Sequence, residues 1–379
     1  MLEYYHKCLS ALLPQRQYRT LQIIIILLQS YRTIQIEKLS AILPIPIKYE
    51  SRRRHLQRFL KLPQLQGEYI WKCLVKKWIK TNPKPARKYY IALDRTRWQG
   101  RNLFVVSLIK DKRAIPLSWT LLLKKGSSSF EEQKRLLKPV LRLFKGNKIV
   151  ILGDREFGHI ALADWLSNQG VEYVLRTKDN KYVQQQGQKE RLLSTLGLRP
   201  RKPLYLHQVK LTKQSGFGLV NIVGYWSKKT RKKNHDEGWY LITNLSSVKQ
   251  AVSAYRHRFG IEAMFKDCKT GGYNLEKCQG SDERLLALVL LIAIAYTSAI
   301  KQGAKIKSLG VQQYVCRLKE PLRMTRRHST FWVGLYGRLW VDADENCQEL
   351  VEELMRLTPN KLPFYQQGQR AKRLILSSF

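Results

Sequence analysis

The sequence KIVILGD at residues 148–154 is an apolar run that ends on an aspartate, and KYYIALD at residues 88–94 has the same form. Short apolar runs rich in β-branched and aromatic residues predict buried strands. Two further β-rich runs, at 103–109 and 114–123, follow the first within a few residues and predict an antiparallel meander. We therefore expect strands of one sheet, two of which end on an acid.

Around these strands, the sequence alternates between helical and strand-like patterns. Ser129 and Glu132 have the spacing of a capping box, which predicts the start of a helix. A stretch rich in Gly, Gln and Lys, residues 179–245, reads as a β-rich insertion. Helices are expected at 129–144, 159–168, 248–269 and 282–300, with further strands at 172–176 and 238–243. The predicted fold class is α/β, a mixed sheet with flanking helices.

The first part of the chain is strongly basic. Up to Lys88 it holds 18 Lys or Arg and four acids. Helices are predicted at 21–28, 36–43 and 48–60, and the third of these carries Arg52, Arg53 and Arg54. A helix, a turn and then a basic helix is how helix-turn-helix modules present a reading helix to DNA. The alternative is that these arginines form only a solvated face.

The charge of the whole chain indicates the class of partner. Lys and Arg total 69 against 28 Asp and Glu, a formal net charge of +41. Self-repulsion of this size destabilises a compact chain unless a polyanion offsets it, so nucleic acid is the expected partner. A highly charged surface without nucleic acid, or a membrane-surface protein, is the alternative.

The sequence also indicates a compartment. The cysteines are scattered without a C-x-x-C pair, which favours neither a disulfide scaffold nor a zinc site: Cys8, Cys73, Cys268, Cys278, Cys316 and Cys347. The N-terminus lacks the order of a secretory signal. The apolar run Leu285–Tyr296 is shorter than a bilayer requires and reads as a buried core helix. We expect a cytoplasmic, nucleoid-associated protein that contacts no membrane.

Two groups of residues are candidates for chemistry. Asp94 and Asp154 are each followed by an arginine, although acids at strand ends are also common turn residues. In a helix of about 100° per residue, Tyr255, Arg258, Glu262 and Lys269 fall within an arc of about 60°, with Lys266 beside them. A carboxylate flanked by cations suits metal-assisted phosphoryl transfer. An exposed, salt-bridged helix face explains the same spacing.

These motifs together resemble the DDE transposases of bacterial insertion sequences. The spacing Tyr255-x2-Arg258-x3-Glu262-x6-Lys269 matches the signature of a cut-and-paste group of that family. Asp94 and Asp154 resemble its first and second acids, and the β-rich insertion precedes Glu262 as it does in related transposases. The resemblance covers roughly residues 88 to 300.

The resemblance implies a ribonuclease H-like fold and a metal-dependent endonuclease. Asp94, Asp154 and Glu262 would be the catalytic residues and would hold two Mg²⁺ ions, with Mn²⁺ as a substitute. One ion would activate water or a 3′-hydroxyl, and the other would stabilise the leaving oxygen. The phosphates of double-stranded DNA would contact Tyr255, Arg258 and Lys269, with Lys266 as an auxiliary contact.

The resemblance also bears on an aromatic residue and on assembly. Trp239 matches a tryptophan that stacks a flipped base in relatives which form a hairpin intermediate, and a core tryptophan is the alternative. The substrates would be element ends and target DNA, joined in a synapse by a homodimer. A catalytically inert DNA-binding protein of transposase descent is the second hypothesis. An RNA-binding or ribosome-associated protein is the third.

The expected organisation has five parts. An N-terminal helical DNA-binding domain covers 1–85. The catalytic domain is divided into 86–178 and 246–330 by the insertion at 179–245. A C-terminal region, 331–379, contains the chain's acidic cluster and is a candidate dimer contact.

Overall fold

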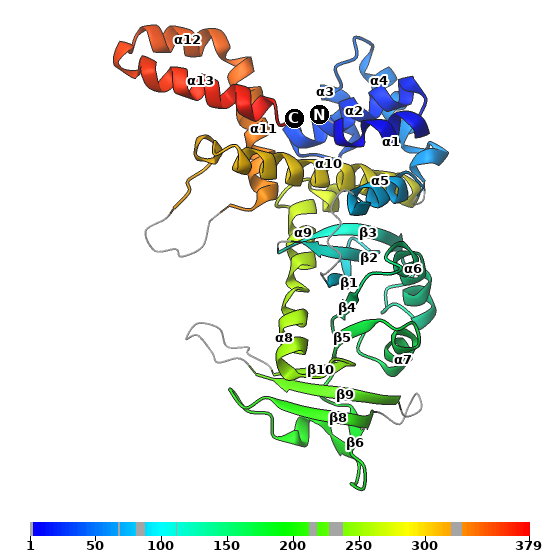
Figure 1. Ribbon diagram of the computed structural model, residues 1–379. Helices are drawn as coiled ribbons and strands as arrows, with labels where there is room; N and C mark the ends of the chain where they lie inside the picture. The colour runs from blue at the N-terminus through cyan, green and yellow to red at the C-terminus, as the bar shows by residue number, and fades with distance from the viewer. Residues whose placement is uncertain are drawn as a thin grey trace. The chain divides into compact units, whose positions relative to one another are not determined.

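The computed structural model describes residues 3–66, 69–80, 88–110, 112–211, 218–226, 238–319 and 328–379 (Figure 1). The chain divides into two compact units. One comprises residues 75–265, and the other combines residues 1–74 with residues 266–379. The predicted domain boundary at residues 85–86 touches residues outside the described ranges.

The unit of residues 75–265 contains a mixed sheet of ten described strands in the order β3-β2-β1-β4-β5-β10-β9-β8-β6-β7. The pair β1–β4 and the pair β4–β5 are parallel, and the other neighbours are antiparallel. The α/β class with a mixed sheet is therefore confirmed. The strands are β1 (Tyr89–Trp98), β2 (Arg101–Lys110), β3 (Arg113–Leu121), β4 (Ile149–Gly153), β5 (Glu172–Thr177), β6 (Tyr182–Gln184), β7 (Arg191–Leu192), β8 (Leu204–Leu211), β9 (Gly218–Tyr225) and β10 (Trp239–Thr243).

The predicted meander is present, but its first strand is longer than expected. β1 continues past Asp94 to Trp98, so Asp94 lies within the strand and pairs with Val105 of β2. A two-residue turn of Gln99 and Gly100, both with positive φ, closes the hairpin, as the twist of paired strands favours. The polar residues after Asp94 resembled a loop because here β1 has only β2 as a described neighbour and is less buried.

Helices cover both faces of this sheet, with α6 and α7 on one face and α8 and α9 on the other (Figure 1). The capping box predicted at Ser129 and Glu132 is formed and begins α6 (Phe130–Leu143). α7 (Ile160–Asn168) begins at His159, whose side chain accepts a hydrogen bond from the Leu162 amide. α6 leads into β4, which ends just before Asp154, and α7 connects Asp154 to β5.

The helix predicted over 248–269 is two helices. α8 (Val248–Arg256) ends and α9 (Phe259–Cys268) begins around a tight turn at His257 and Arg258. The amides of His257, Arg258, Gly260 and Ile261 each donate to the carbonyl three residues earlier, which is the tighter 3₁₀ pattern. The angular arc calculated for one straight helix therefore does not apply across the turn.

The second unit is helical. Its N-terminal elements are α1 (Glu3–Leu12), α2 (Gln15–Tyr31), α3 (Ile36–Ile42), α4 (Tyr49–Leu60) and the first residues of α5 (Tyr69–Lys80). They share a core with α10 (Asp282–Ser308): Tyr5 donates a hydrogen bond of 2.8 Å to Thr297, and Gln29 donates to the Ala295 carbonyl. The N-terminal helices and residues 266–379 thus fold together, and a linear sequence contains no local signal for this.

α10 is the central helix of that unit. It extends beyond the predicted apolar run, and among the described helices it alone is long and apolar enough to cross a membrane. However, 83% of its apolar window is buried. It crosses α11 (Thr330–Asn346) at Gly303 and Gly334, where a Cβ on either glycine would overlap a carbonyl oxygen of the other helix. α10 is therefore the core helix of the unit.

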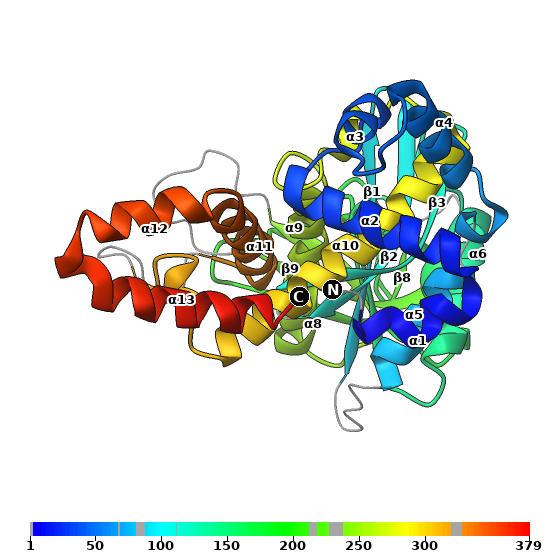
Figure 2. The same ribbon diagram turned by 90° about the horizontal axis from the view of Figure 1, so that it is seen from above.

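The C-terminal end of the chain forms a helical hairpin. α12 (Gln348–Arg356) and α13 (Leu362–Leu376) lie side by side after α11 (Figure 2). None of the residues of α12 is buried. Two leucines of this helix and the leucine that follows it are exposed: Leu350, Leu354 and Leu357. The ion pair of Lys372 with Asp344 joins α13 to α11.

Candidate active site

Asp94 and Asp154 occupy equivalent positions on two neighbouring parallel strands. The register pairs Leu93 of β1 with Gly153 of β4, and each aspartate is the next residue. Adjacent strands lie about 4.8 Å apart, so the two acids are neighbours across the sheet. Each carboxylate also accepts a backbone hydrogen bond, Asp94 from the Arg95 amide at 2.8 Å and Asp154 from the Glu156 amide at 3.1 Å. Both side chains are thus oriented by hydrogen bonds from amides one or two residues further along the chain.

Arg258 connects Asp94 to the third acid. Its Nη1 lies 3.3 Å from Asp94 Oδ2, and its Nη2 forms an ion pair with Glu262 Oε1. Because one guanidinium contacts both carboxylates, Asp94 and Glu262 are separated by no more than that group and its two contacts. The side chain of Arg258 is 9% exposed, whereas that of Glu262 is 50% exposed. The tight turn between α8 and α9 places Arg258 under Glu262 in this way.

The electrostatics of Asp94 reflect all these neighbours. Burial raises the pKa of Asp94 to about 7, and the Arg258 guanidinium opposes this shift. The charges of Asp154 and Glu262 raise the pKa of Asp94 further. Like charges that raise a carboxyl pKa must be close enough to interact across the protein. The structure therefore brings Asp94, Asp154 and Glu262 into one electrostatic cluster.

The cluster supplies the type of donor atom that a divalent cation binds, but these atoms do not form a preorganised coordination site. Among the described residues, no three His, Cys, Asp or Glu side chains are close enough together to hold a metal ion. The oxygen donors of Asp94, Asp154 and Glu262 are the type that Mg²⁺ and Mn²⁺ prefer. A buried carboxyl with a raised pKa gains from a nearby cation, and Arg258 is the cation that contacts it here.

Tyr255 and Trp239 belong to an aromatic cluster beside Arg258. Tyr255 is 1% exposed, and its ring meets the Trp239 ring edge-on at 5.1 Å. Trp239 is half-buried and also packs against Tyr225 and Phe259. The guanidinium of Arg258 lies over the rings of Tyr255 and Phe259. These contacts support a packing role for Trp239 beside any contact it makes with DNA.

The two lysines of the predicted arc fall in the other unit. Lys266 is exposed, and Lys269 Nζ lies 2.5 Å from Glu276 Oε1. Lys269 is therefore engaged with an acid of its own unit.

The basic helix predicted near the N-terminus is α4, which packs on α3. Arg53 forms ion pairs with Glu37 and Glu50, and Arg54 with Glu50. The side chain of Arg54 is 66% exposed and that of Arg53 is 34% exposed, while Arg52 is half-buried. The helix–turn–basic helix arrangement exists, and DNA binding by it stays a prediction.

A cavity of about 460 Å³ is lined by Arg155, the residue after Asp154. Its lining includes three cations, Arg155, Arg176 and Lys178, and the rings of Trp226 and Tyr240. Burial lowers the pKa of Arg176 from its usual value. Sequence reasoning did not find Arg176, although it lies near the end of β5, the strand that pairs with β4 on the side away from β1. Finding Arg176 would have required the order of the strands in the sheet, which the sequence does not state.

Part of the sequence, and the fold, are similar to those of known proteins. The sequence model of the transposase DDE domain matches residues 125–298, somewhat less than half of the chain, which include Asp154 and Glu262. A solved structure, the piggyBac transposase synaptic complex with hairpin DNA determined by cryo-EM, is 14% identical, with a TM-score of 0.45. That similarity covers 92% of this chain and 78% of the other. No curated protein matches the sequence. Residues 125–298 are thus similar to a transposase DDE domain.

Proposed function

We propose that the protein is a DNA transposase of the cut-and-paste type found in bacterial insertion sequences. The observation that carries this is the convergence of Asp94, Asp154 and Glu262 around Arg258, in a chain whose central part matches a transposase DDE domain. The meander followed by parallel strands with connecting helices supports a ribonuclease H-like fold. The net charge of +41 supports DNA as the partner.

The three acids are the residues that we propose hold the catalytic metal, as two Mg²⁺ ions or Mn²⁺ in their place. Bound there, the ions would supply a nucleophilic oxygen and stabilise the leaving oxygen during in-line displacement at phosphorus. Asp94 lies within β1, Asp154 directly follows β4, and the side chain of Glu262 is the more exposed, at 50%. Asp94 must lose its proton to serve as a ligand, which its raised pKa makes sensitive to pH near neutrality.

The cations and aromatic residues have separate proposed roles. Before DNA binds, Arg258 keeps two carboxylates paired. A DNA phosphate then offers Arg258 a competing anion, which would free the carboxylates, and Tyr255 supports the guanidinium from beneath. Lys269, Lys266 and the Arg52–Arg54 segment would contact phosphates further along the duplex. Trp239 would stack a base only if the aromatic cluster opens.

The homodimer also stays a prediction. The leucines exposed on and after α12 stand next to acids of the same helix, in a chain that is otherwise basic. A second copy of the chain would offer both an apolar face and the opposite charge.

A catalytically inert DNA-binding protein is the second candidate. The pairing of Arg258 with two of the acids, and the lack of a close three-acid group among the described residues, favour it. The two candidates differ in one measurable property, which is whether the chain cleaves DNA.

The test is cleavage of a plasmid that carries the coding gene with its flanking DNA, with Mg²⁺ or Mn²⁺ present. We expect cleavage at the gene's flanks, and a loss of roughly 10³-fold or more in the Asp154→Asn variant with DNA binding retained. Glu131→Gln removes a charge from an acid that is 75% exposed in the same unit and serves as the matched control. DNA binding without cleavage by the unmodified protein would favour the inert candidate, and equal cleavage by Asp154→Asn would remove Asp154 from the site.

A further inference from the structure

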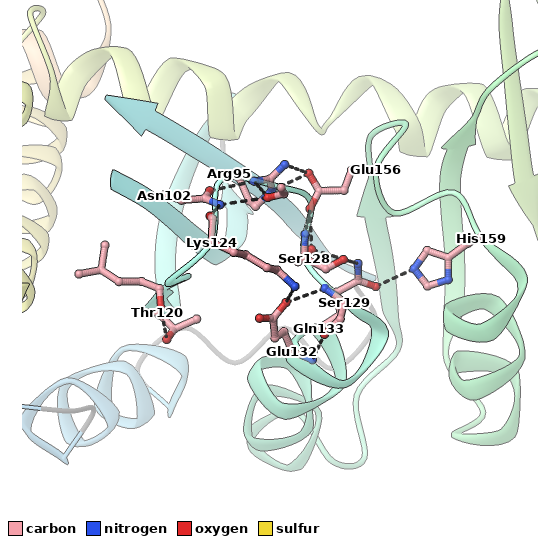
Figure 3. Close-up of polar contacts among 12 residues, drawn as sticks. Arg95, Asn102, Thr120, Lys124, Ser128, Ser129, Glu132, Gln133, Glu156 and His159 are labelled. Atoms are coloured by element: carbon pink, nitrogen blue, oxygen red, sulfur yellow. Dashed lines mark hydrogen bonds and ion pairs between the residues drawn. The ribbon is translucent and has the colours of Figure 1, made fainter. Parts of the chain in front are cut away.

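Next to the two aspartates, the protein buries an ion pair that the proposed mechanism does not use. Arg95 follows Asp94 in β1, and Glu156 follows Asp154 by two residues. Arg95 Nε donates to Glu156 Oε2 at 2.5 Å, and Nη2 contacts the same carboxylate (Figure 3). The side chains are 8% and 12% exposed. Burying two opposite charges carries a desolvation cost that the pair and its further hydrogen bonds must offset, so the contacts around it show what it holds in place.

The pair is hydrogen-bonded by the segment between β3 and α6 and by Asn102 of β2. Glu156 Oε1 accepts from the Ser128 amide at 2.8 Å and from its hydroxyl at 2.5 Å. Arg95 Nη1 donates to Asn102 Oδ1 at 2.8 Å and to the Gly126 carbonyl at 2.9 Å. Asn102, which is 2% exposed, donates in turn to the Lys124 carbonyl. Figure 3 shows that these contacts form one continuous network.

The network extends to the start of the helix after β4. Gln133 of α6 donates to the Ser128 hydroxyl at 3.1 Å, and His159 Nε2 lies 2.9 Å from Gln133 Oε1. His159 in turn caps α7 through its other ring nitrogen. β4 ends at Gly153, and the chain after Asp154 is tied to β1 and α6 by the side chains of Glu156 and His159.

We propose that Arg95 and Glu156 are positioning residues that fix the separation of the carboxylates of Asp94 and Asp154. The backbone amides of these two residues donate to the two aspartates, and their side chains bind each other. A single covalent and hydrogen-bonded path thus runs from one carboxylate to the other. Asp154 lies beyond the last β1–β4 pair, Leu93 with Gly153. Without this path, no ladder hydrogen bond would hold it.

This inference rests on the proposed function, since it assumes that the two aspartates bind a shared cation. Groups that orient metal ligands without touching the metal commonly change metal affinity or activity by roughly 10- to 100-fold when they are replaced. Electrostatics alone makes a different prediction. Replacing Arg95 and Glu156 together removes one positive and one negative charge, so the local net charge stays the same.

The experiment measures Mn²⁺ affinity of the full-length protein by titration calorimetry, without DNA, for Glu156→Gln and for the double variant Arg95→Gln/Glu156→Gln. We expect both variants to bind Mn²⁺ roughly 10-fold more weakly or worse, with DNA affinity changed less than about twofold. If the double variant regains the affinity of the unmodified protein, the effect is one of charge and the proposal fails. Unchanged Mn²⁺ affinity in both variants also overturns it.

A matched pair at the other end of the sheet is the control. Lys88 and Glu172 form an ion pair with Nζ to Oε2 at 2.6 Å, and both side chains are 36% exposed. Glu172→Gln should leave Mn²⁺ affinity unchanged, and an equal fall there would make the loss a general effect of stability. Because calorimetry needs no cleavage, absence of DNA cleavage by the unmodified protein would refute the proposed function alone. Absence of Mn²⁺ binding by the unmodified protein would refute both.

Discussion

At the amino-terminal ends of β1 and β5, Lys88 and Glu172 form an ion pair that remains open to water. Toward the carboxyl end of β4, a second ion pair of Arg95 and Glu156 is almost completely buried, and Asp94 and Arg258 are buried beside it. The first arrangement is typical of surface charges, which contribute little. The second incurs a desolvation cost, which its hydrogen bonds to Ser128, Asn102 and Gly126 offset. The two pairs thus differ in burial, and only the buried pair lies beside Asp94 and Asp154.

The largest effect that separates the two ends should come from Asp94. Because burial raises its pKa to about 7, the folded protein holds the Asp94 proton more tightly than the unfolded chain does. The contribution of Asp94 to the free energy of unfolding is therefore greatest below the unfolded pKa and is lost as the pH rises through about 7. Asp94→Asn should be more stable than the unmodified protein at pH 8, by an amount on the order of a few kcal/mol, with little difference at pH 4.

Denaturant unfolding at the two pH values measures this difference. Asp164→Asn is the control for an aspartate outside the cluster of acids. Burial also raises the pKa of Asp164, but this residue lies on α7. A constant difference between Asp94→Asn and the unmodified protein across this pH range would contradict the assigned pKa shift.

An intermediate effect is expected at Arg258. If this guanidinium moves to a DNA phosphate, Arg258→Ala should weaken DNA binding and reduce the slope of log affinity against log salt by about one unit. Lys269→Ala tests the same property in the other unit, where Glu276 competes for the lysine. Fluorescence anisotropy over a series of salt concentrations provides the slopes. A slope that Arg258→Ala leaves unchanged would mean that Arg258 serves only the carboxylates.

The smallest effect should be at the open end of the sheet. Glu172→Gln removes one partner of a pair that water already screens, so the free energy of unfolding should fall by less than about 1 kcal/mol. Thermal unfolding at low and high salt measures this, and the small difference should shrink further at high salt. A larger loss would show that the two ends of the sheet are less different than their exposure indicates.

Much of the sheet was predictable because its information is local. The runs ending at Asp94 and Asp154 are apolar and β-rich, and the capping box at Ser129 and Glu132 depends on two side chains three residues apart. Asp94 was wrongly placed at a strand end because the residues after it are polar, and they are polar because that part of β1 has fewer neighbours.

The remaining features depend on contacts between distant residues. The break before α9 was missed because the segment has helical spacing on both sides of Arg258. Arg95 and Glu156 were visible only as charges next to the aspartates, and nothing in the sequence says that they meet. Recognising that opposite charges follow two predicted neighbouring strands would have suggested the pair. The shared core of α2 and α10 has no such local sign.

The two aspartates are also anchored in different ways, and this bears on how each can move. Asp94 is embedded in the β1–β2 ladder, so displacing its backbone requires breaking the sheet. Asp154 lies after the last residue of β4, where side-chain bonds hold the chain, and such a segment opens locally at far lower cost. Amide hydrogens should therefore exchange slowly around residue 94 and faster around residues 154–156. The position of Asp94 is thus set by the sheet, whereas that of Asp154 depends on the side-chain contacts that follow it.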